Sequence, residues 1–127
     1  MPNQTKLLTK VKEFLLRLSE GTCLVSFYIG KSEDVAMREL QHQEEGFCKS
    51  VEIAYSSSSA KIDKAERFLI DSFKKIEMPI AFDNKNDGGG GNPQANKLYV
   101  SLRLKMKSDS DLWDDEDDNF IFKSIEL

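Results

Sequence analysis

The segment from Phe27 to His42 has the pattern of a strand, a short polar turn and a helix, and it constrains the fold more than any other stretch. Its first residues are β-branched and aromatic, which favours a strand. Gly30 then permits a turn or a close approach of the backbone to a neighbour. Ser32 or Asp34 can cap the helix that follows. The segment therefore predicts one strand–turn–helix unit.

Two basic side chains on this predicted helix, Arg38 and His42, are four residues apart and so share one face. Ala36 and Leu40 lie on the opposite face, and we expect them to pack inward. With Tyr28 on the preceding strand, a phenol, a guanidinium and an imidazole are expected near one point of the surface.

A second predicted helix, from Ala60 to about Ile76, places Glu66 in the middle of its apolar stripe. A carboxylate there must be paired, protonated or bound to a cation, because an isolated buried charge is too costly. A salt bridge, or a stripe wide enough for Glu66 to reach solvent, accounts for the pattern equally well.

These residues resemble the second half of the GIY-YIG nuclease signature. A Tyr-Ile-Gly strand end begins at Tyr28, Arg38 follows the tyrosine by ten residues, and His42 follows by four more. Glu66 resembles the family's metal-binding glutamate, which lies on such a helix. The resemblance covers about residues 24–92.

The resemblance implies a metal-dependent endonuclease that hydrolyses phosphodiester bonds in DNA. Glu66 would hold one Mg²⁺ or Mn²⁺, which can bind through a single protein carboxylate with waters and the substrate phosphate. Arg38 would stabilise charge on the phosphate. Tyr28 would hold or deprotonate water, and His42 would position that water or shuttle a proton.

The N-terminal segment departs from this pattern. The family begins with a Gly-Ile-Tyr strand, whereas Arg17 stands eleven residues before Tyr28, with no glycine or tyrosine beside it. Residues 5–18 have the apolar spacing of an amphipathic helix. Either Phe14–Leu18 is a degenerate first strand or a helix replaces it. The missing tyrosine favours an alternative function, a catalytically inactive module that binds nucleic acid or a protein partner. An accidental motif match is a third interpretation.

Substrate contacts are expected from Gly30 and Lys31 at the strand end, and from Asn84 and Asn86 in the glycine-rich loop 83–93. That loop lacks the Gly-Lys-Ser/Thr ending of a P-loop. It is therefore either a flexible connector or a segment whose amides contact a phosphate or a metal-bound water.

Residues 97–107 alternate strictly between apolar and polar side chains, the pattern of a strand with one face on the core. The polar face, which begins at Tyr99 and Ser101, is expected to be solvated or to contact phosphate. We expect this strand to form a hairpin with residues 120–126. The predicted fold is a single α+β domain over residues 1–127, with a small mixed or antiparallel central sheet flanked by helices, an N-terminal amphipathic helix and a C-terminal hairpin.

The net charge of −4 is unevenly distributed, because seven acids and no base occupy the segment 109–118. Removing seven negative charges from −4 leaves +3, so the net charge does not exclude a nucleic-acid partner. The segment is expected to be a solvated loop, or else a phosphate mimic whose deletion would tighten nucleic-acid binding. No apolar run is long enough to cross a membrane. Cys23 and Cys48 lack metal-ligand spacing, and we expect reduced thiols in a cytoplasmic protein.

Overall fold

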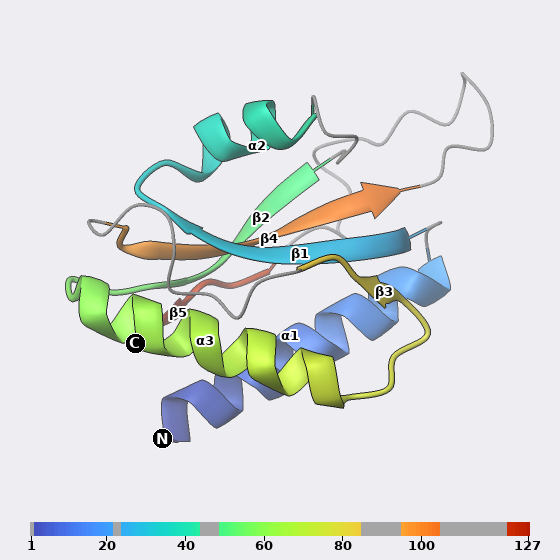
Figure 1. The fold of residues 1–127 in the computed structure, drawn as a ribbon, viewed down its shortest axis with the longest axis horizontal. Coiled ribbons are helices and arrows are strands. Elements are labelled where there is room, and N and C mark those ends of the chain that lie inside the picture. The colour runs from blue at the N-terminus through green and yellow to red at the C-terminus, as the bar shows by residue number, and fades with distance from the viewer. Residues whose placement is uncertain (1, 22–23, 44–48, 85–94, 105–121) are drawn as a thin grey trace.

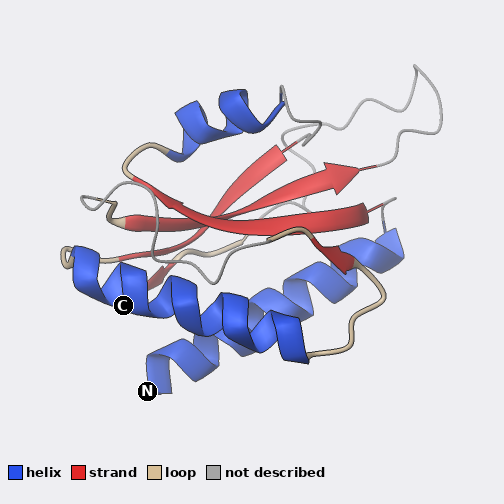
Figure 2. Cartoon of the chain, viewed as in Figure 1, coloured by secondary structure: helices blue, strands red, loops and turns tan. Residues whose placement is uncertain are grey.

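A computed structural model describes residues 2–21, 24–43, 49–84, 95–104 and 122–127. The elements follow the order α1 (Pro2–Gly21), β1 (Leu24–Ser32), α2 (Val35–Gln43), β2 (Lys49–Tyr55), α3 (Ser59–Lys75), β3 (Ala81–Phe82), β4 (Lys97–Leu104) and β5 (Ile125–Glu126). The predicted α+β class is confirmed: a mixed sheet is flanked by helices, with a helix at the N-terminus and a strand at the C-terminus (Figure 2).

In the described residues, the strands form one sheet in the order β3-β1-β4-β2-β5. The central strand β4 is antiparallel to both of its neighbours, β1 and β2. The short outer strands are parallel to the strands they join, β3 to β1 and β5 to β2. It follows that β1, β2 and β3 all run in the same direction.

The helices cover opposite faces of this sheet. Helix α2 packs on one face, against β1, β4 and β2, while α1 and α3 pack on the other (Figure 1). Helix α2 connects β1 to β2, and the connection through α3 returns from β2 to β3 in the opposite direction across the sheet. Right-handed connections that run in opposite directions must cross opposite faces. The chain order therefore separates α2 from α3.

The hydrophobic core lies between the sheet and the pair α1 and α3. In α1, the buried side chains follow helical spacing at Leu7, Val11, Phe14, Leu15 and Leu18. The predicted helix over residues 5–18 is thus confirmed, and Phe14–Leu18 is helical. The apolar side chains of β4, namely Leu98, Val100 and Leu102, also enter this core as predicted.

Helix α3 begins and ends close to the predicted residues. Ser58 is its N-cap, and the Ser58 side chain accepts a hydrogen bond from the backbone N–H of Lys61. Its apolar stripe is buried at Ile62, Ala65, Leu69, Ile70 and Phe73. Phe73 contacts Phe27 of β1 edge-on, with ring centroids 5.1 Å apart, which fastens the helix to the sheet.

Several local expectations were wrong. The first strand does not stop at Gly30 but continues to Ser32. Leu40 does not pack inward, because 66% of its surface is exposed. Helix α2 is rotated so that Glu39 faces the sheet instead, where its carboxylate accepts a hydrogen bond from the backbone N–H of Ser50 at 2.8 Å. This rotation gives the Glu39 carboxylate a backbone donor on the sheet.

The C-terminal pairing also differs from the prediction. In the described residues, β5 pairs with β2 in parallel, and β2 separates β5 from β4. The expected hairpin between residues 98–106 and 120–126 is therefore wrong where the structure describes it. The acidic segment 109–118 lies outside the described residues.

Within the described ranges, the helices are too short or too polar to traverse a lipid bilayer.

Candidate functional site

Tyr28 and Gly30 lie on the sheet face that α2 covers. Tyr28 is half-buried, and its ring centroid is 6.4 Å from that of Tyr99 on the neighbouring strand. Gly30 pairs with Tyr99 in the β1–β4 ladder, and the Tyr99 ring occupies the space where a Gly30 side chain would stand. The glycine of the Tyr-Ile-Gly tripeptide thus makes room for Tyr99. Tyr99 is only 2% exposed and Ser101 is fully buried, so the predicted solvated face is wrong at these two residues.

Arg38 and His42 belong to α2, on the same side of the sheet as Tyr28. Their side chains lie outside the part of the chain that the structure describes. Their predicted catalytic roles stay predictions.

Lys31 lies on the opposite face from Tyr28 and Gly30. Its Nζ is 2.9 Å from Oδ1 of Asp63 on α3, and its side chain is only 7% exposed. Asp63 also pairs with Arg67 one turn further along α3, at 3.2 Å. This ion pair joins the end of β1 to the start of α3, and the expected substrate contact of Lys31 stays a prediction.

Glu66 is buried in the apolar stripe of α3, as its position in the sequence predicted. It is 5% exposed and has an interaction partner, as a buried carboxylate requires. However, α3 packs on the sheet face opposite to α2 (Figure 1). The sheet therefore separates Glu66 from Tyr28 and from the helix that carries Arg38 and His42.

These positions do not fit the expected Mg²⁺ or Mn²⁺ site. A nuclease of this kind needs the metal ligand and the groups that hold water and phosphate around one reacting phosphorus atom. Here the expected ligand and the expected partners lie on the two sides of the sheet. Among the described residues, no group of three or more His, Cys, Asp or Glu side chains could hold a metal ion.

Asn84 extends the pairing of β3 with β1. Its side-chain amide donates a hydrogen bond to the carbonyl of Ile29 at 2.8 Å, and its Oδ1 accepts one from the Ile29 N–H at 2.7 Å. Both functions of the amide are therefore used in completing the sheet edge. Asn86, the other asparagine expected to contact substrate, lies outside the described residues.

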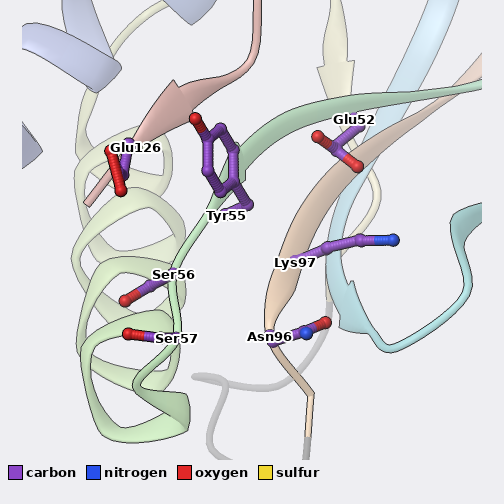
Figure 3. A pocket seen from close by; sticks show the side chains of 7 residues that line it. All are labelled: Glu52, Tyr55, Ser56, Ser57, Asn96, Lys97 and Glu126. Carbon is purple, nitrogen blue, oxygen red and sulfur yellow. The ribbon is translucent and has the colours of Figure 1, made fainter.

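A pocket of about 470 Å³ lies at the carboxyl end of β2, beside the beginning of β4 (Figure 3). Its walls carry both hydrogen-bond donors and hydrogen-bond acceptors. The lining residues are Glu52, Tyr55, Ser56 and Ser57 from β2 and the following turn, Asn96 and Lys97 at the start of β4, and Glu126 from β5. The loops that leave β1 and β2 here lead to helices on opposite faces.

Tyr55 reaches this pocket because β2 contains an irregularity. The register with β4 shifts between Glu52 and Ala54, and Ile53 and Ala54 are both fully buried. Strict alternation would place Tyr55 on the core side with Val51 and Ile53, but the extra residue moves it to the other face. It is therefore 41% exposed. Two adjacent apolar residues, Ile53 and Ala54, are the signal of this irregularity in the sequence.

A second pocket, of about 480 Å³, adjoins the first. It is lined by lysines from two segments, Lys6 and Lys10 of α1 and Lys123 before β5, together with Tyr55 and Glu126, which line both pockets. No ion pair of the three lysines is found in the described part of the chain. Ser124, also in the lining, has a buried Oγ with no hydrogen-bond partner among the described residues. We define these two pockets and Tyr55 between them as the Tyr55 groove.

No family model matches the chain, and neither a curated protein nor a solved structure matches it. The likeness to GIY-YIG nucleases therefore stays a resemblance of spaced residues.

Proposed function

We propose that this chain binds single-stranded nucleic acid in the Tyr55 groove and does not cleave it. The observation that carries the proposal is that the exposed Tyr55 lines one pocket together with three lysines that have no ion pair in the described residues. Proteins that bind single strands combine cationic side chains, which follow the phosphates, with aromatic rings on which bases stack. This is the binding alternative that the sequence already left open.

Charge in the groove favours an anion. Four lysines line the two pockets against two glutamates, Glu52 and Glu126. Lys6 and Lys10 are exposed and one helical turn apart, so adjacent phosphates of one strand can be contacted together. A duplex would fit less well, because its bases are stacked on one another and unavailable to Tyr55.

The proposal is tested by fluorescence anisotropy with a labelled twelve-nucleotide single strand, in DNA and RNA form, and with the matching duplex. We expect single-strand binding in the micromolar range at low salt. Lys6→Gln with Lys10→Gln should reduce the slope of log K against log salt by about 1.4, at about 0.7 per phosphate contact on a single strand. Tyr55→Leu should weaken binding roughly tenfold through lost stacking.

The matched control replaces Lys64 and Lys75 by glutamine. These two exposed lysines of α3 line neither pocket, yet their loss changes the net charge equally. An equal loss of affinity in both double variants would mean that binding follows net charge and not the groove. Absence of binding to any strand at low salt would overturn the proposal, as would an acidic peptide that binds as tightly as the oligonucleotide.

A further inference from the structure

The two pockets of the Tyr55 groove differ in chemistry, and this difference suggests what each receives. The pocket at the end of β2 offers an amide, a carboxylate and a hydroxyl, from Asn96, Glu52 and Ser57. Asparagine and glutamate side chains can pair with the donor and acceptor edges of a nucleobase. The neighbouring pocket offers the ammonium groups of Lys6, Lys10 and Lys123, which suit a phosphate.

Tyr55 and Glu126 line both pockets and so mark the boundary between them. They are register partners in the β2–β5 ladder, which fixes them side by side at the end of the sheet. Figure 3 shows the Tyr55 and Glu126 side chains next to each other on the wall of the first pocket. A ligand bound at this boundary can therefore contact groups of both pockets.

We infer that the Tyr55 groove recognises one nucleotide unit. The base would lie in the pocket at the end of β2, which contains Asn96, and the 5′-phosphate would lie among Lys6, Lys10 and Lys123. The inference rests on the proposed function, but it is narrower: a single nucleotide is sufficient for binding, and the remainder of the strand adds contacts outside the two pockets.

The first test measures binding of AMP, UMP, adenosine and inorganic phosphate to the full chain by calorimetry and by displacement of the labelled oligonucleotide. We expect AMP or UMP to bind at least tenfold more tightly than either adenosine or phosphate, because only the nucleotide fills both pockets. Inorganic phosphate that binds as tightly as the nucleotides would overturn the inference, since the site would then recognise phosphate alone.

Variants separate the two halves of the site. Lys6→Gln with Lys10→Gln should lower AMP affinity to that of adenosine and leave adenosine binding unchanged. Asn96→Ala should reduce adenosine and AMP affinity by equal factors, whereas the Lys64→Gln and Lys75→Gln control should change neither. If AMP binding is equally weakened by the control pair, the assignment of the phosphate to this pocket is wrong.

The outcomes for the inference and for the proposed function are distinguishable. Oligonucleotide binding that depends on Tyr55, without displacement by millimolar AMP or UMP, would overturn the one-nucleotide inference and leave the proposed function standing. If the wild-type protein binds neither the oligonucleotide nor the single nucleotides, both the inference and the proposed function are overturned. Circular dichroism of each variant at the binding temperature shows whether it is folded. Binding affinities are then compared only between folded proteins.

Discussion

The phenol ring of Tyr99 lies where the β-carbon of residue 30 would stand if residue 30 were not glycine. A β-carbon built on Gly30 would be 2.5 Å from Cζ and 2.9 Å from Cε1 of Tyr99, far inside van der Waals contact. The two residues are direct partners across the β1–β4 ladder, and Tyr99 is 2% exposed, so the ring has little room to move. Packing therefore explains a glycine that the sequence motif had suggested was functional.

Gly30→Ala should accordingly destabilise the protein by about 1–3 kcal/mol, the usual cost of overpacking a filled interior. Urea denaturation measures the change in the free energy of unfolding. The double variant Gly30→Ala with Tyr99→Leu should recover part of the loss, because the two residues interact directly. Equal destabilisation by Gly30→Ala with and without Tyr99 would contradict this explanation.

Lys31→Met should leave oligonucleotide affinity unchanged, since Lys31 faces α3 and is paired with Asp63. Stability should fall by about 1 kcal/mol, because Asp63 is partly exposed and keeps Arg67 as a partner. Anisotropy and urea denaturation on the same preparation measure the two effects. A drop in affinity as large as that of the Lys6 and Lys10 double variant would instead support the substrate contact predicted from the sequence.

Asn84→Ala should lower the free energy of unfolding by about 1–3 kcal/mol, because it leaves the N–H and carbonyl of Ile29 without their partner at the sheet edge. Asn84→Asp keeps the acceptor but sets a carboxylate oxygen against the Ile29 carbonyl, so its effect should be at least as large. Asn96→Ala, at an exposed asparagine, should change stability by less than about 0.5 kcal/mol. Similar stability of the Asn84→Ala and Asn96→Ala variants would show that the Asn84 amide does not hold the edge.

Supercoiled plasmid should remain intact with this protein in Mg²⁺ or Mn²⁺, because the sheet lies between Glu66 and the helix that carries Arg38 and His42. Gel electrophoresis of the plasmid, with wild type beside Glu66→Gln and Arg38→Ala, measures nicking. We expect all three proteins to match a chelator-treated control. Nicking by the wild type that disappears in both variants and with chelator would establish the nuclease instead.

Periodicity in the sequence predicted the parts of the fold that depend on neighbours along the chain. The helix that carries Glu66 and the alternation from Leu98 to Leu102 are examples, and both appear as expected. Strand partners depend on residues far apart in the chain, so the parallel pairing of β5 with β2 was not predictable from local pattern. The direction of the connections across the sheet is equally non-local, and it decides that Glu66 and α2 lie on opposite faces.

The candidate site was predicted least well, for a local reason and a distant one. The register shift before Ala54 moves the Tyr55 side chain to the other face of the sheet. A single extra residue of this kind is hard to recognise within a short strand. The lysines of the groove come from α1 and from the segment before β5, which no motif joins. Residue spacing also predicted a substrate contact at Gly30, whereas the position of Tyr99 gives this glycine a packing role.

The central position of β4 has a consequence for how the chain reaches this fold. Strands β1 and β2 are not paired with each other, and the strand that joins them is formed by residues 97–104, much later in the chain. Closing such long loops must precede most of the sheet's hydrogen bonds, which slows folding. During synthesis, β1, β2 and the helices α1, α2 and α3 emerge before the sheet can close. Until then both strands keep open edges, the condition in which a nascent chain is most prone to aggregate.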